Sequence, residues 1–200
     1  KLLLAEKSKN YLLRIIEWRT RMIKGGKGGG NTRTGLIFEG KTDLSNFLNN
    51  QPHYSVIEHD VLYDGEKVAE VYKKYKFYDV FLAKLGIEWK RFISKRLLPD
   101  DSIFVLLNNT LFIIECKHQQ TQGSVDEKLQ TCDFKKKQYK KLMSAANIDV
   151  EYIYLLDDWF RDEKYRDVLD YIHSVGCDYY FEYIPLHRLG LPVPPELIED

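Results

Sequence analysis

Hydrophobic residues in this chain fall into short runs separated by charged and turn-forming residues. Two apolar runs, residues 102–107 and 111–114, flank an Asn-rich turn at Asn108-Asn109. Runs of this length, rich in β-branched and aromatic residues and joined by such a turn, predict a β-hairpin over about residues 100–118. A third run, residues 152–156, predicts another buried strand.

The rest of the pattern predicts helices around these strands. Helices are expected over the following segments: 2–23, 34–50, 75–85, 126–146 and 162–174. Residues 54–72 are expected to contain a hairpin turning at Asp64-Gly65, and residues 179–181 a last strand before a proline-rich tail. Strands that alternate with helices after the first hairpin predict an α/β fold, with a mixed central sheet flanked by helices and an N-terminal helical extension.

Length and composition favour one domain. With 200 residues, 44% of them hydrophobic, the chain can form a substantial core. We expect an N-terminal helix and Gly-rich loop over residues 1–31, the core over 32–184 and a tail over 185–200. Three cysteines, an odd number without CxxC spacing, indicate a reduced cytoplasmic protein without structural zinc. The N-terminal segment has charges throughout and no cleavage site, which favours an amphipathic helix over a targeting sequence.

The net charge of zero conceals an uneven distribution. Residues 1–41 hold 10 Lys or Arg against 3 Asp or Glu, whereas residues 148–200 hold 4 against 13. The basic N-terminal part can supply a nucleic-acid surface, although a solvated charged helix explains it equally well. Its Gly-rich loop, residues 25–30, places Lys27 and Arg33 where they can contact phosphates, or simply tethers two helices.

The hairpin brings acids and a lysine together. If its loop has two residues, Asp100 faces Lys117 and Ser102 faces Glu115, so that Asp100, Glu115 and Lys117 share one face of the sheet. A loop of three residues brings Asp101 onto that face instead. The sequence leaves the choice between the two aspartates open.

Two carboxylates with a nearby lysine suit metal-assisted hydrolysis of a phosphodiester. Mg²⁺ prefers hard oxygen ligands and shares its coordination shell with waters and substrate phosphates. Lys117 can orient or deprotonate the attacking water, or neutralise charge on the phosphate. An acid-x-Lys triplet alone says little, since five others occur in this chain. Glu115-Cys116-Lys117 differs because it stands at the end of a strand that is apolar on both faces, where charged residues are unusual. The alternative explanation for these charges is that the ends of the hairpin simply reach solvent.

At these residues the chain resembles the PD-(D/E)XK nuclease superfamily, and within it the type II restriction endonucleases. Residues 32–39 resemble the early helix of that family, and residues 123–130 the start of the helix after the catalytic strand, so the resemblance covers about residues 32–160. It implies metal binding by Asp100 or Asp101 together with Glu115, and a catalytic role for Lys117. It also implies an accessory acid and a supporting amide, namely Glu39 and Gln119.

The resemblance implies a Mg²⁺-dependent endonuclease, with Mn²⁺ as a substitute, that cuts double-stranded DNA at a specific sequence. DNA contacts are expected from His118, Gln119 and Gln120, which leave the catalytic strand, and from Lys135 in a helix whose lysines are mostly solvated. Cutting both strands favours a homodimer, and a cognate DNA methyltransferase is the expected partner. The alternatives are a structure-specific repair or recombination nuclease and a non-catalytic DNA-binding module on the same scaffold.

Overall fold

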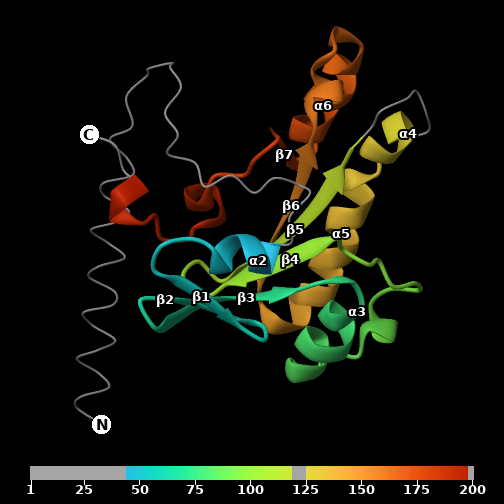
Figure 1. Ribbon diagram of the computed structural model, residues 1–200. Helices are drawn as coiled ribbons and strands as arrows, with labels where there is room; N and C mark the ends of the chain where they lie inside the picture. Colours follow the sequence, from blue (N-terminus) through green and yellow to red (C-terminus); the bar gives the residue numbers. More distant parts are fainter. Residues whose placement is uncertain (1–43, 119–124, 198–200) are drawn as a thin grey trace. The chain divides into compact units, whose positions relative to one another are not determined.

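The computed structural model describes residues 44–118 and 125–197. Its centre is a seven-stranded sheet whose strands lie side by side in sequence order (Figure 1). The strands are β1 (Tyr54–Ile57), β2 (Asp60–Tyr63), β3 (Glu66–Tyr72), β4 (Asp101–Val105), β5 (Thr110–Lys117), β6 (Asp149–Leu156) and β7 (Asp178–Phe181). Strands β1 to β5 pair antiparallel, while β5, β6 and β7 pair parallel. The prediction of a mixed sheet is confirmed.

Helices cover both faces of this sheet (Figure 1). They are α2 (Leu44–Asn49), α3 (Lys74–Lys76), the π-helix η1 (Phe77–Leu82), α4 (Val125–Leu129), α5 (Cys132–Met143) and α6 (Arg166–Ser174). The shorter 3₁₀ turns are η2 (Trp89–Arg91), η3 (Ser144–Ala146), η4 (Asp158–Arg161), η5 (Glu163–Tyr165), η6 (Leu186–Leu189) and η7 (Pro195–Leu197). One face packs against η1, α5 and α6, and the other against α2 and the chain around η6. Within the described ranges, no helix has the length and apolarity needed to cross a membrane.

The predicted helix over residues 126–146 is interrupted, and this expectation is corrected. Helix α4 stops at Leu129 and α5 begins at Cys132. The Lys128 carbonyl accepts hydrogen bonds from the hydroxyls of Thr131, at 2.7 Å, and Tyr154, at 3.0 Å. Side chains therefore satisfy a carbonyl at the end of α4, which lets this helix stop before α5 begins at Cys132.

Several local signals are confirmed. The hairpin between β2 and β3 turns at Asp64 and Gly65, which have φ angles of 49° and 78° as a tight two-residue turn requires. The helical region after α5 ends at Asn147, in the left-handed conformation. The predicted helix at 2–23 and the first part of the one at 34–50 lie outside the described residues.

The chain after β7 is tied to β1 and β2. Tyr54 donates its hydroxyl proton to the Pro192 carbonyl at 2.6 Å. The imidazole of His53 bridges two acids, with Nδ1 2.6 Å from Asp64 Oδ1 and Nε2 2.8 Å from Glu196 Oε1. The hydrogen bond with Glu196, and then the one with Asp64, raise the pKa of His53 above 6.5.

We expect this attachment to weaken as the pH rises. Only protonated imidazole donates from both nitrogens, so with the carboxylates ionised the double contact is complete below pH 6.5 and is lost as the pH passes the raised pKa. Hydrogen exchange of the Val193 and Glu196 amides, the two backbone N–H groups between residues 192 and 196, should be slower in the wild type than in His53→Gln at pH 6, and equal in the two at pH 9. An equal difference at both pH values would contradict the expectation.

Candidate active site

The hairpin of β4 and β5 has a longer loop than the sequence suggested. Asp101 pairs with Ile114 and Val105 with Thr110, so residues 106–109 form a four-residue loop. The two-residue and three-residue loops are both wrong, as are the predicted pairs of Asp100 with Lys117 and of Ser102 with Glu115.

Hydrogen bonds at both ends of the loop hold it in place. The Leu106 N–H bonds to the Val68 carbonyl of β3 at 3.0 Å, which continues the ladder between β3 and β4. The Asn108 side chain accepts the Thr110 N–H at 3.2 Å and closes the turn locally. The apolar residues Leu106 and Leu107 therefore belong to the loop, although they look like part of a strand.

The shift moves the pairing by two residues along β5, which preserves the face of each side chain. Ser102 and Ile113 are opposite one another, and continuing that alternation puts Asp100 across from Glu115. Asp100 precedes the first residue of β4, and its Oδ2 accepts the Cys116 backbone N–H at 3.2 Å. The structure thus brings Asp100, not Asp101, to the face that carries Glu115.

Lys117 joins the two acids. Its Nζ lies 3.0 Å from Glu115 Oε2 and 3.9 Å from Asp100 Oδ2. It also donates to the Cys116 carbonyl at 3.3 Å, and it lies 5.9 Å from the centre of the Tyr154 ring on β6. An ammonium and two carboxylates therefore converge where β4 begins and β5 ends.

Asp101 occupies the opposite face. It is buried and lies 3.5 Å from the Lys73 ammonium. Burial raises the pKa of the neighbouring Cys116 thiol to about 12, and the charge of Asp101 adds to the shift. Ile103 and Ile114, on the same face, belong to the core beneath α2. The position of Asp101 suits a structural ion pair.

Glu115 remains ionised although it is buried, with 8% of its side chain exposed. Burial alone would raise the pKa of this carboxyl, but the ammonium groups of Lys117 and Lys135 outweigh burial and hold the pKa below its usual value. Lys135, from α5, lies 2.8 Å from Oε1 and 2.7 Å from Oε2. The site therefore contains two lysines, one from each side of the carboxylate.

The position of Lys135 at Glu115 is a feature that sequence reasoning missed. The sequence favoured solvent for most lysines of this helix, and Lys137, Lys140 and Lys141 are indeed exposed. Lys135 contacts Glu115 instead, and Lys136 is buried and pairs with Glu151 at 2.7 Å. The helical repeat offered a signal for this position. Residues 132, 136, 139 and 143 are apolar or buried and mark the face of α5 that packs against the sheet, and residue 135 lies next to that face.

The other residues that the sequence predicted for the site either follow the end of β5 or lie outside the described residues. His118 is exposed just after β5, with Nδ1 3.8 Å from Asp157 Oδ2. Outside the described residues lie the following: Lys27, Arg33, Glu39, Gln119 and Gln120. Their predicted roles stay predictions.

The oxygen atoms of this cluster fit a hard divalent cation. Asp100 and Glu115 offer carboxylates, and the Cys116 carbonyl is near enough to accept from Lys117. Mg²⁺ commonly binds through one or two carboxylates while waters and phosphates complete its shell. Across residues 44–118 and 125–197, His, Cys, Asp and Glu form no group of three or more that could hold a metal.

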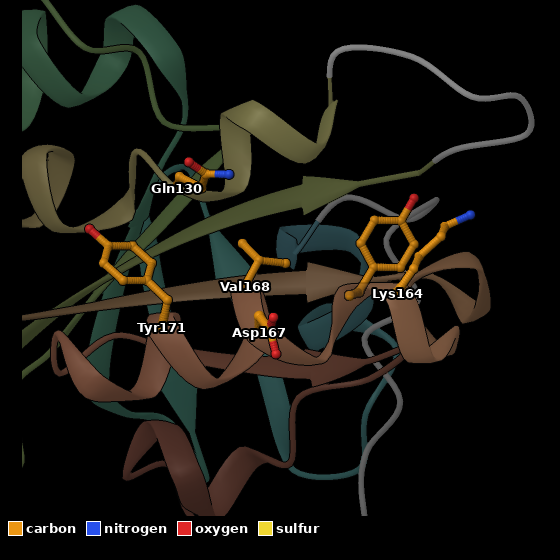
Figure 2. Close-up of a pocket in the computed structure, with 6 residues that line it drawn as sticks. Gln130, Lys164, Asp167, Val168 and Tyr171 are labelled. Atoms are coloured by element: carbon orange, nitrogen blue, oxygen red, sulfur yellow. The ribbon is translucent and has the colours of Figure 1, made fainter.

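A separate cavity of about 520 Å³ lies between the end of α4 and the start of α6. Figure 2 shows Gln130 on one wall, and Lys164, Asp167, Val168 and Tyr171 on the other. Asp100, Glu115 and Lys117 do not line it. The cluster of Asp100, Glu115 and Lys117 is therefore separate from this cavity and lies where β4 begins and β5 ends.

The family comparison covers the segment that contains this cluster. Residues 66–148 match a family model described as a PD-(D/E)XK nuclease superfamily domain. No curated protein and no solved structure matches the chain significantly. The match includes β3, β4, β5 and α5, and therefore Asp100, Glu115, Lys117 and Lys135.

Proposed function

We propose that the chain is a Mg²⁺-dependent endonuclease that cuts double-stranded DNA, on the premise that residues 66–148 match a PD-(D/E)XK nuclease superfamily domain. The match supports a phosphodiester hydrolase with a nucleic acid as its substrate, and divalent metals are typical of such nucleases. The finer proposal is a type II restriction enzyme that cuts at a specific sequence. The observation that carries the nuclease proposal is the convergence of Asp100, Glu115 and Lys117 at one point.

Asp100 and Glu115 would hold the cation. Glu115 is ionised and fixed on β5, and the more exposed Asp100, with 43% of its side chain accessible, faces arriving solvent and substrate. A bound divalent ion supplies Lewis acidity and a more acidic water at such a site. The chain itself contributes the placement of two negative charges beside one ammonium.

Lys117 would position the attacking water and balance charge on the phosphate. Its side chain is 18% exposed, and contacts with Glu115 and the Cys116 carbonyl fix the orientation of its ammonium. A positioned cation in a partly buried site stabilises developing negative charge more strongly than a mobile one in water. This role agrees with the place of the lysine in the D/E-x-K motif.

The proposal also includes the DNA contacts, the accessory acid and the partners that the sequence predicts. His118 lies directly after the catalytic strand, and Lys27, Arg33, Gln119 and Gln120 are candidate DNA contacts by sequence. Glu39 is a candidate accessory acid. Because a single site cuts one strand, a homodimer is the economical arrangement for double-strand cleavage. A methyltransferase that modifies the same DNA sequence would be the partner of such an enzyme.

Digestion of a long plasmid by the purified full chain tests the proposal. With Mg²⁺ or Mn²⁺ we expect discrete fragments, and with EDTA we expect none. Smearing, or cutting only at junctions and flaps, would favour a structure-specific repair nuclease. DNA binding without hydrolysis in either metal would favour a non-catalytic module and contradict the enzyme proposal.

A further inference from the structure

Lys135 contacts the carboxylate that we propose as a metal ligand. Its ammonium donates to both oxygens of Glu115, at 2.8 and 2.7 Å, while Lys117 donates to Oε2 at 3.0 Å. Within the described residues, both hydrogen bonds of the Lys135 ammonium go to Glu115. The carboxylate therefore has a protein cation on each of its oxygens.

The two lysines differ in how firmly they are held. Lys117 also contacts the Cys116 carbonyl and lies near Asp100, so it retains partners if Glu115 turns to another cation. Lys135 reaches the carboxylate from α5, a helix held by the bond of Tyr139 to the Leu97 carbonyl at 2.9 Å. Its flexible four-carbon stem can turn without movement of the helix, and 23% of its side chain is exposed.

We propose that Lys135 and the divalent cation exchange places on Glu115, and that the released ammonium binds a phosphate of the nucleic acid. This inference rests on the proposed function. A divalent cation bound by Glu115 competes with the two ammonium groups for the lone pairs of the carboxylate, and its double charge repels them more strongly than they repel each other. A phosphate then gives the free ammonium a charge-assisted hydrogen bond of the same kind that it loses.

The exchange makes metal and nucleic acid cooperate at this site. Without nucleic acid, Lys135 competes with the metal and lowers its affinity. With nucleic acid, the phosphate holds Lys135 away from Glu115, so metal binds more tightly, and by linkage metal strengthens DNA binding by the same factor. Lys135 thus acts as a positioning residue whose partner depends on what is bound.

Metal titration of the full chain without DNA tests the exchange. Mn²⁺ binding is measured by calorimetry for the wild type, Lys135→Met, Lys135→Gln and the control Lys141→Met, which changes an exposed lysine on the same helix. Removal of the competing Lys135 ammonium from Glu115 should tighten Mn²⁺ binding about 3- to 10-fold in both Lys135 variants. Lys141→Met should match the wild type.

A second measurement follows the released ammonium. Binding of a duplex oligonucleotide is measured with and without Ca²⁺ across a salt series. In Ca²⁺, Lys135→Met should bind the duplex several-fold more weakly, and its salt dependence should decrease by about one phosphate contact. The factor by which Ca²⁺ strengthens DNA binding should be smaller than in the wild type. Lys135→Gln, which keeps a polar side chain, provides the same comparison if Lys135→Met does not fold.

The outcomes separate this inference from the proposed function. If the wild type binds Mn²⁺ and cuts DNA while both Lys135 variants bind Mn²⁺ no more tightly, the exchange is overturned and the nuclease proposal stands. Weaker Mn²⁺ binding in the variants also overturns it, since Lys135 would then support the metal site. A wild type that neither binds Mn²⁺ nor cuts DNA overturns both.

Discussion

Replacing Lys117 with methionine is expected to lower the rate of DNA cleavage by about 10²- to 10³-fold, the usual effect of removing one positioned charge from a transition state. Methionine retains most of the apolar stem, so the fold should persist. Lys135 continues to neutralise Glu115 at 2.7 Å, which limits any loss of stability. Single-turnover cleavage of a plasmid in saturating Mg²⁺ measures the change, and circular dichroism checks the fold.

The matched control is Lys90→Met, because Lys90 is exposed and its ammonium lies over the Trp89 ring. Cleavage by this variant should stay near the wild-type rate. Glu115→Gln should also lose cleavage, and the double variant should be little worse than either single one, since residues that act as a unit are not additive. Cleavage by Lys117→Met within a few-fold of the wild type would remove Lys117 from the mechanism.

The second large effect separates the two adjacent aspartates. Asp100→Asn should reduce cleavage at least about 100-fold, because it removes a negative charge at the point shared with Glu115 and Lys117. Its effect on stability should be small, since the side chain is 43% exposed and asparagine can still accept the Cys116 N–H. The measurements are single-turnover cleavage and urea unfolding.

Asp101→Asn should show the reverse. Asp101 is buried on the other face and pairs with Lys73, so loss of its charge should lower the free energy of unfolding by about 1–2 kcal/mol. Cleavage per folded molecule should change only a few-fold. If Asp101→Asn abolishes cleavage in a folded protein and Asp100→Asn does not, the assignment of the metal ligand to Asp100 is wrong.

The sequence was most informative where local chemistry decides local structure. The Asp64-Gly65 turn, the end of the helical region at Asn147 and the strand at residues 152–156 were all predicted, because each depends on nearby residues alone. The D/E-x-K triplet at the end of an apolar run identified the family that the comparison supports. The prediction of one long helix over 126–146 was wrong. The interruption between α4 and α5 involves a hydrogen bond from Tyr154 of β6, a residue distant in sequence.

By itself, the sequence determined the α/β pattern of strands and helices, the hairpin and the cluster of an aspartate with Glu115 and Lys117, since periodicity and motif spacing are properties of the chain. Only the tertiary structure decided between Asp100 and Asp101, because that choice depends on the register in which β4 and β5 pair in the folded sheet. It alone also brought Lys135 to Glu115. Burial and pairing across distant elements set those choices, and neither is written in the local order of residues.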